Sequence, residues 1–187
     1  MINWFPEVAP VRGGADINLE NEPMKIQPWN TQNDLSKAIR QKMIELLNQQ
    51  LADALDLASQ TKQAHWNVKG PSFIALHELF DEVVEEIQEY ADDLAERAVE
   101  LGGTAYGTVR VAAEKSRLGE YPLEISSGRE HVTALSGALA RFGKTARTAI
   151  DAAAGLGDAD TADLFTEISR GVDKLLWKVE VHNQAKD

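Results

Sequence analysis

Four long segments of this chain repeat apolar residues at the i, i+3, i+4 spacing of an amphipathic helix, with glycine or proline between them. This pattern constrains the fold more than any other feature, because helices with one apolar stripe are stable only when the stripes pack together. Gly70-Pro71, Gly102-Gly103 and Gly155 are typical helix stops. The segments cover about 33–68, 72–101, 127–155 and the residues after Asp160 to Val179.

Capping residues mark the expected helix starts. Ser72 is a good N-cap for the second helix, and Ser127 and Glu130 have the spacing of a capping box for the third. The fourth helix is expected to begin after Asp160, with Asp163 in its first turn.

A long connection, residues 104–126, separates the second helix from the third. We therefore expect an all-α, ferritin-like four-helix bundle over residues 35–187, with a short helix between Val109 and Leu118 in the crossover. Residues 1–34 hold four of the six prolines and are expected to form a flexible N-terminal arm.

Composition narrows the chemistry. The 187 residues include no cysteine, so any metal must be held by histidine and carboxylate. The formal net charge of -11 disfavours a nucleic-acid or anionic-membrane surface and favours cations as partners. No stretch approaches the roughly 18 apolar residues of a membrane span, and the first residues lack a signal-peptide pattern. We expect a soluble, cytoplasmic protein.

The second helix carries ten acidic residues and a single base. A run of this kind is ordinarily a solvated face. On a helical wheel, four of the acids lie well away from the apolar arc: Glu82, Glu86, Asp93 and Glu100. Four other residues lie along the border of the arc, where partial burial makes a bare carboxylate costly unless a positive charge compensates it: His77, Asp81, Asp92 and Glu96.

These border residues form two i, i+4 pairs, His77 with Asp81 and Asp92 with Glu96, and each pair can converge on one ion. Asp81 and Asp92 are separated along the helix by roughly 16 Å, at about 1.5 Å per residue. One ion therefore cannot touch both pairs of the same helix. If both pairs act on one metal, a second subunit must run antiparallel across a two-fold interface.

His65 is a further candidate ligand, because a tight turn at Gly70-Pro71 would place it level with His77. A lone histidine is more often a hydrogen-bonded core residue, but the second imidazole and the paired acids favour a metal site. Imidazole and carboxylate ligands suit iron, zinc or manganese. A di-iron site inside one bundle has Glu-x-x-His on two helices, and this chain has no such motif, which favours a site between subunits.

The stretch from His65 to Asp81, HWNVKGPSFIALHELFD, and the segment 92–98, DDLAERA, closely resemble the Dps family (DNA-binding proteins from starved cells), the mini-ferritins. Tyr121-Pro122-Leu123 and residues 160–177 look like later landmarks of that family. The resemblance covers about residues 35–184.

This resemblance implies a hollow dodecamer that binds Fe(II) between two-fold-related subunits. The iron is oxidised preferentially by hydrogen peroxide and stored as a ferric mineral, which protects the cell from oxidative stress. The implied ferroxidase site takes three residues from one subunit and two from its partner: His65, His77 and Asp81, then Asp92 and Glu96. Trp66 would lie beside the site and trap stray oxidising equivalents, with helix packing as the alternative interpretation.

The resemblance also implies an iron-uptake pore at the start of the fourth helix, lined by Asp158, Asp160 and Asp163. Helix capping by Asp160 and dipole stabilisation by Asp163 are the alternative interpretation.

The family name suggests DNA binding, but the charge of the arm argues against it. DNA-binding members use tails rich in lysine or arginine. Residues 1–34 contain two basic and five acidic residues, and the C-terminal end is not basic. We expect weak or absent DNA binding. The alternatives are a nucleoid-associated DNA-binding protein, and a mini-ferritin that binds zinc or manganese with little oxidase activity.

Overall fold

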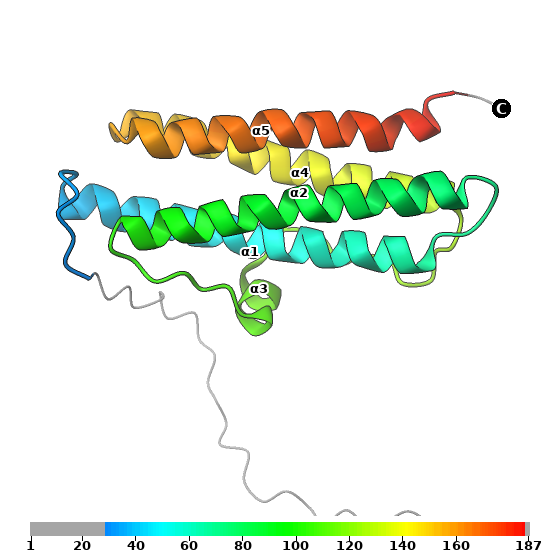
Figure 1. Ribbon diagram of the computed structural model, residues 1–187, viewed down its shortest axis with the longest axis horizontal. Coiled ribbons are helices and arrows are strands. Elements are labelled where there is room, and N and C mark those ends of the chain that lie inside the picture. The colour runs from blue at the N-terminus through cyan, green and yellow to red at the C-terminus, as the bar shows by residue number, and fades with distance from the viewer. Residues whose placement is uncertain (1–28, 186–187) are drawn as a thin grey trace, which may run out of the picture.

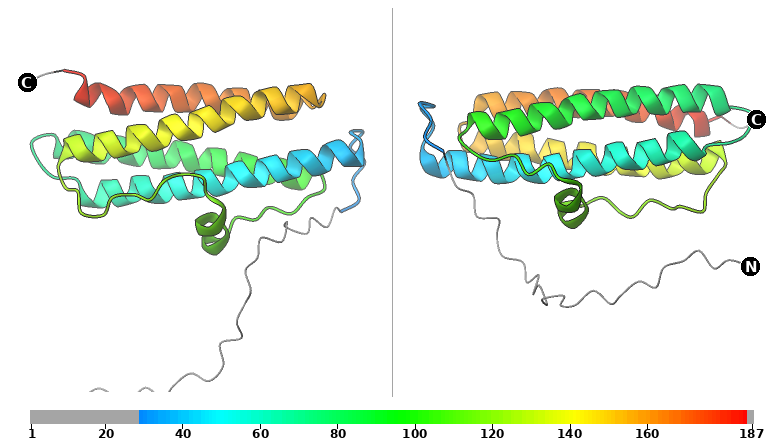
Figure 2. Two further views of the ribbon diagram at one scale, coloured as in Figure 1. Left: turned by 180° about the vertical axis from the view of Figure 1, so that it is seen from behind. Right: turned by 60° about the horizontal axis from the view of Figure 1, so that its bottom comes forward.

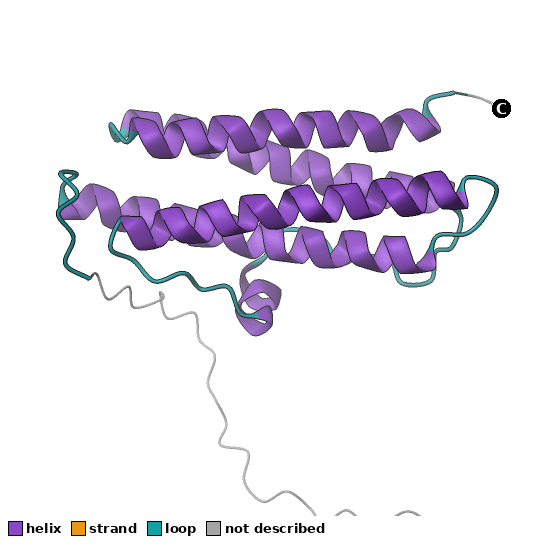
Figure 3. Cartoon of the chain, viewed as in Figure 1, coloured by secondary structure: helices purple, strands orange, loops and turns teal. Residues whose placement is uncertain are grey.

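The computed structural model describes residues 29–185, so residues 1–28 of the expected arm lie outside the described part of the chain. Four long helices lie side by side along the molecule, and a short helix stands against them (Figure 1). The helices are α1 (Lys37–Asn67), α2 (Phe73–Glu100), α3 (Val109–Lys115), α4 (Gly128–Gly155) and α5 (Ala159–Glu180), followed by a 3-10 turn at Val181–Asn183. Residues 29–185 contain no β-strand (Figure 3), and the predicted all-α four-helix bundle is confirmed.

The connectivity follows the predicted pattern. Helices α1 and α2 form one hairpin, and α4 and α5 form a second. The crossover from α2 to α4 runs along α1 and carries α3, which packs on α1 (Figure 2). Helix α3 lies within the predicted range 109–118. This long crossover lets the two hairpins close around one core.

Helix starts agree with the sequence only in part. Helix α1 begins a few residues later than expected, because Ser36 caps it and accepts a hydrogen bond from Ile39 N at 3.3 Å. The capping box is confirmed, since Ser127 Oγ accepts from Glu130 N at 3.3 Å and Glu130 Oε2 accepts from Ser127 N at 3.1 Å. Ser72 precedes α2 as predicted, but its side chain accepts no hydrogen bond from the helix.

The predicted start of α5 is wrong by two residues. Asp158 is the N-cap, and its Oδ1 accepts a hydrogen bond from Thr161 N at 3.0 Å. Asp160 is therefore in the first turn rather than at the cap, and Asp163 lies beyond that turn. Closely spaced aspartates offer the same capping chemistry, so the sequence pattern does not choose between them.

The core lies between the two hairpins and is filled by the predicted apolar stripes. Large side chains that are completely buried include Leu47, Phe80, Ile87, Leu94, Leu135, Phe142 and Phe165. Each contributes about 1.5–3 kcal/mol relative to an exposed side chain. Other apolar side chains that face this core are only partly buried, among them Ile39, Leu46, Leu55, Ile150 and Leu176. None of the helices in residues 29–185 is long and apolar enough to cross a membrane.

Polar side chains of α1 fasten the crossover to the bundle. Asp53 is completely buried, and it accepts hydrogen bonds from Arg117 N at 2.7 Å and Arg117 Nε at 2.9 Å. One turn further along α1, Asp56 Oδ2 accepts from Ser116 Oγ at 2.5 Å. The end of α3 and the residues after it are thus held against α1 by charge-assisted hydrogen bonds.

The last part of the crossover is tied to α4 by Tyr121 and His131. The Tyr121 hydroxyl lies 2.6 Å from His131 Nδ1. His131 is almost completely buried, and this burial lowers the pKa of its imidazole. The ring is therefore neutral near pH 7. The carbonyl of Asn67 also acts on this ring and can only accept, so the ring hydrogen lies on Nε2 and Nδ1 accepts the hydrogen bond of the phenol.

We expect His131 to make the fold less stable in mild acid. The pKa of an unfolded histidine is near 6.5, whereas burial holds the folded value lower. Below about pH 6.5 the unfolded chain binds a proton at this histidine and the folded chain does not. The stability that is present above this pH is therefore lost as the pH falls toward the pKa of the folded state. Thermal unfolding between about pH 7.5 and 5 should therefore lose stability more steeply in the wild type than in His131→Asn. His182→Gln, which removes an exposed histidine, should keep the wild-type slope. Equal slopes in wild type and His131→Asn would contradict the prediction.

Candidate metal centre

The turn between α1 and α2 brings His65 and His77 together. Gly70 supports this turn at φ +112°, a conformation that favours glycine. The two imidazole rings stack, with centroids 3.6 Å apart and planes inclined by 21°. The expectation that the two rings face each other across the hairpin is met.

Reciprocal hydrogen bonds fix how the two rings are oriented. His65 Nδ1 lies 2.8 Å from the His77 carbonyl oxygen, and His77 Nδ1 lies 2.9 Å from the His65 carbonyl oxygen. A carbonyl oxygen only accepts, so Nδ1 of each ring carries the proton. Nε2 is then the nitrogen of each ring that can bind a metal, which an imidazole does in its neutral form.

Asp81 follows His77 by one turn of α2 and joins the histidines. Its Oδ1 lies 3.2 Å from His65 Nδ1 and also contacts the ammonium group of Lys62 on α1. The hydrogen bond from Lys62 and the charge of its ammonium group hold the pKa of the Asp81 carboxyl below its usual range. We call His65, His77 and Asp81 the imidazole set. The positive charge beside the carboxylate of this set is the ammonium group of Lys62.

Sequence reasoning missed Lys62. The signal was present, because Lys62 lies three residues before His65 and shares its face of the helix. It was overlooked because an ammonium group is not a metal ligand. Its importance depends on the contact between α1 and α2, which the spacing within one helix does not show.

A hollow of about 500 Å3 lies beside the imidazole set. Its lining combines charged groups with apolar side chains and includes Leu55, Ala58, Lys62, Trp66, Asp81, Val84 and Glu85. The Trp66 side chain lies at this hollow and is 67% exposed. The indole thus lies beside the candidate site and is not packed in the core of its own chain.

Asp92 and Glu96, which we call the carboxylate set, lie toward the other end of α2. Both are exposed, so the expected partial burial is wrong for them in a single chain, although it holds for His77 and Asp81. The two sets are roughly 16 Å apart along α2. Among residues 29–185, no three His, Asp or Glu side chains are grouped closely enough to hold a metal ion. One chain therefore presents two incomplete sets of donors.

The three aspartates at the start of α5 lie in different surroundings. Asp158 is only 2% exposed, and its Oδ1 accepts a hydrogen bond from Arg97 Nη2 at 3.0 Å. Arg97 Nε also donates to Thr161 Oγ1 at 3.0 Å. Asp160 and Asp163 are exposed, and of the three carboxylates only theirs face solvent in this chain.

Comparisons with known proteins agree with this fold. Residues 44–185 match the ferritin-like domain of the Ferritin family. The DNA protection during starvation protein of Agrobacterium fabrum is 45% identical over 159 residues, which are 83% of this chain and 96% of that protein. The Dps structure from Mycobacterium smegmatis has a TM-score of 0.78 at 31% identity, covering 82% of this chain and 93% of that one. Dps from Microbacterium arborescens in its high iron form has a TM-score of 0.75 at 33% identity, covering 80% and 97%.

Two helix hairpins joined by one long crossover define the ferritin-like class of bundles. Within that class, the identity to the Agrobacterium fabrum protein and the likeness to the two Dps structures are decisive. The chain belongs to the Dps family of mini-ferritins.

Proposed function

We propose that this protein is an iron-oxidising and iron-storing oligomer whose ferroxidase sites form between subunits. The observation that supports this most is the division of donors on one chain, with the imidazole set near the α1–α2 turn and the carboxylate set further along α2. A second copy of α2 running antiparallel would place the carboxylate set of each chain against the imidazole set of the other. The two-fold axis would then generate two equivalent sites for each pair of subunits.

The donors suit Fe(II) as substrate. The Nε2 atoms of the two imidazoles and the carboxylates bind Fe(II), and the negative charge of the carboxylates favours Fe(III) still more. Two Fe(II) ions at one site supply the two electrons that, with two protons, reduce one hydrogen peroxide to water. No hydroxyl radical is released when both electrons pass together. Hydrogen peroxide is the oxidant we propose, with molecular oxygen as a slower substitute.

The remaining steps are uptake and storage. We propose that the chain assembles as a dodecamer in the cytoplasm and that Asp160 and Asp163 draw Fe(II) toward a pore, because both carboxylates are exposed. Asp158 is paired with Arg97, so its proposed contribution is to hold the start of α5 in place. The exposed acids of α2 add to the attraction for cations.

Lys62 should compete with metal at the imidazole set. Its ammonium contacts Asp81 Oδ1, so this oxygen can bind a metal only after the lysine moves away. We expect Lys62→Met to bind a redox-inert probe such as Zn(II) about tenfold more tightly, which corresponds to about 1.4 kcal/mol. Isothermal titration of the metal-free oligomer measures this affinity.

The matched control is Lys42→Met, which removes the same charge from an exposed position on the same helix, about 30 Å away. Its affinity for Zn(II) should stay at the wild-type value. Unchanged or weaker binding by Lys62→Met would show that the lysine supports the site instead of competing for it.

The proposal is tested by loading the purified oligomer with Fe(II) without oxygen and then adding hydrogen peroxide or air in separate runs. Fast oxidation that is faster with peroxide, with the ferric product kept soluble in a large particle, is the expected result. Oxidation at the rate seen in buffer, or precipitation of iron, would overturn it. Repeating the run with Mn(II) or Zn(II) in competition identifies the preferred metal.

We propose weak or absent DNA binding, although relatives carry names that refer to DNA protection. The net charge of -11 repels phosphate, and the first 34 residues carry more acids than bases. A gel shift of plain duplex DNA at moderate ionic strength, without divalent metal, would contradict this.

A further inference from the structure

The hydrogen bond between Tyr121 and His131 joins a half-buried phenol to an almost completely buried base. The hydroxyl and Nδ1 are 2.6 Å apart, short for a neutral pair. The two rings are nearly parallel, with an interplanar angle of 15°. His131 is 1% exposed, so water does not compete for Nδ1. Burial raises the pKa of Tyr121, so the phenol keeps its proton in the resting protein.

The second ring nitrogen of His131 is also buried. Nε2 makes no hydrogen bond of regular geometry, but the backbone carbonyl of Asn67 acts on the ring and favours its protonated form. A carbonyl oxygen only accepts, so the hydrogen of the neutral ring lies on Nε2, and Nδ1 is the nitrogen that accepts from Tyr121. The same carbonyl stabilises the positive charge that the ring gains with a second proton.

We propose that Tyr121 is a redox-active tyrosine that donates one electron to stray one-electron oxidants of the iron reaction while its phenolic proton moves to His131 Nδ1. The inference rests on the proposed function for the source of the oxidant, which is a hydroxyl radical or the oxidised indole of Trp66. A tyrosine can lose an electron readily only if its proton leaves at the same time, and a neutral imidazole in direct contact provides the acceptor.

The step balances in electrons and protons. Tyr121 loses one electron and its O–H bond breaks, giving a neutral phenoxyl radical and a protonated His131. The hydroxyl radical takes the electron and becomes hydroxide. A further Fe(II) ion then returns one electron to the phenoxyl radical and becomes Fe(III), while the proton moves back from His131. The net change is that one Fe(II) ion and one hydroxyl radical become Fe(III) and hydroxide.

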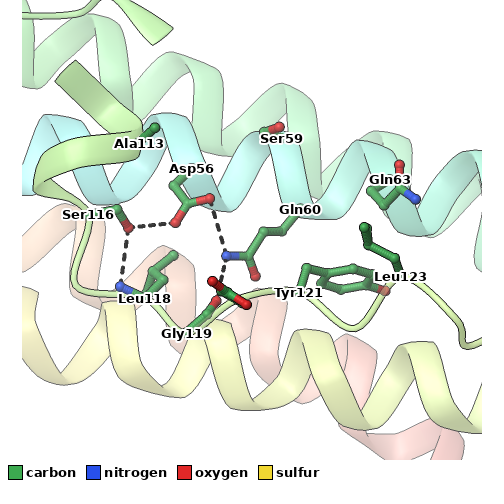
Figure 4. A pocket seen from close by; sticks show the side chains of 11 residues that line it. Asp56, Ser59, Gln60, Gln63, Ala113, Ser116, Leu118, Gly119, Tyr121 and Leu123 are labelled. Atoms are coloured by element: carbon green, nitrogen blue, oxygen red, sulfur yellow. Dashed lines mark hydrogen bonds between the residues drawn. The ribbon is translucent and has the colours of Figure 1, made fainter. Parts of the chain in front are cut away.

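The position of the pair is suited to this role. Tyr121 lines a hollow of about 470 Å3 between α1 and the crossover, together with Gln60 and Gln63 of α1 (Figure 4). Trp66 lies about one turn beyond Gln63 on the same helix. On the other side of the pair, the carbonyl of Asn67, the residue after Trp66, acts on the His131 ring and favours its protonated form. Both members of the pair thus border the segment of α1 that carries His65 and Trp66.

The test uses the metal-free oligomer, so that it does not depend on iron oxidation. Azide radical made by pulse radiolysis oxidises tryptophan, and transfer to tyrosine appears as phenoxyl absorbance that grows while the indolyl absorbance decays. The chain has three tyrosines, so three single variants assign the radical: Tyr90→Phe, Tyr106→Phe and Tyr121→Phe. We expect only Tyr121→Phe to abolish the growth, and we expect His131→Asn to slow it. Trp66→Phe should reduce its amplitude.

A phenoxyl signal that survives Tyr121→Phe, or that is unaffected by His131→Asn, would overturn the inference. Circular dichroism and thermal unfolding of each variant separate a lost radical from a lost fold. A second arm freezes the wild-type reaction of Fe(II) with hydrogen peroxide and looks for the phenoxyl radical by electron paramagnetic resonance. If iron is not oxidised there while the radiolysis result stands, the proposed function fails and the redox assignment of Tyr121 survives.

Discussion

Subunits that carry Asp81→Asn and subunits that carry Glu96→Gln are each expected to lose iron oxidation and to regain part of it when they assemble together. Each substitution removes the charge of one carboxylate and keeps its shape. We expect each variant alone to oxidise Fe(II) about 10–100-fold more slowly, the loss typical when a metal site loses one supporting group. The expected recovery follows from the proposed arrangement, in which Asp81 of one subunit and Glu96 of the other belong to the same site.

In a two-fold pair that contains one subunit of each kind, the two defects fall in the same site. The other site takes its imidazole set from the Glu96→Gln subunit and its carboxylate set from the Asp81→Asn subunit, so it is intact. Random mixing makes half of the pairs mixed, and half of their sites are whole. About a quarter of the wild-type oxidation rate should therefore return after the two variants are denatured and refolded together.

Asp93→Asn is the matched control, because Asp93 is an exposed neighbour of Asp92 that points away from the apolar face of α2. It should oxidise iron at the wild-type rate, alone or mixed. If the mixture of Asp81→Asn and Glu96→Gln stays as inactive as its parts, the two sets do not meet across subunits, and the proposed site is wrong. Size-exclusion chromatography confirms that the mixed subunits assembled.

Replacing Arg117 by methionine is expected to destabilise the fold by about 3–5 kcal/mol, the usual effect of leaving a buried charge without its partner. Asp53 is completely buried, and Arg117 supplies both its nearest cation and three of its hydrogen-bond donors, namely the backbone N–H and two guanidinium nitrogens. The variant keeps the backbone donor and loses the guanidinium, which lies 2.5 Å from Asp53 Oδ2. Urea unfolding at a fixed protein concentration measures the loss.

Arg110→Met is the control, because it makes the same change at an exposed position in the same crossover. It should change the free energy of unfolding by no more than about 0.5 kcal/mol. The double variant Asp53→Leu/Arg117→Met should be more stable than Arg117→Met, since it removes the buried charge as well. Equal stability of the Arg110 and Arg117 variants would show that the crossover is not held by this pair.

The bundle and its crossover were predictable because they depend on periodicity. The apolar stripes of α2 and α5 identify buried positions such as Phe80 and Phe165 without any knowledge of their partners. Helix starts were less predictable where several side chains compete for one cap, as Asp158 and Asp160 do. The capping box at Ser127 was predictable because it requires two residues, a serine at the cap and a glutamate three residues later, and only one position fits both.

In the candidate site, too, the features that depend on local spacing were predictable and those that depend on long-range contacts were not. The facing of His65 and His77 follows from their distances to the Gly70 turn, which is local information. Lys62 and the Tyr121–His131 pair depend on contacts between elements far apart in sequence, and no spacing rule within one helix reports such contacts. Asp92 and Glu96 are exposed in a single chain because the surface we propose to cover them belongs to another copy.

Arg97 attaches the C-terminal part of α2 to α5, so the two ends of α2 are held in place by different parts of the fold. The imidazole set is positioned by the turn at Gly70, whereas the residue next to Glu96 is held by the first turn of α5 through Asp158 and Thr161. Each set of donors therefore has its own support. A change in the α1–α2 turn can alter the geometry of the imidazoles and leave the carboxylates in place, so natural variation can adjust the two halves of the site one at a time.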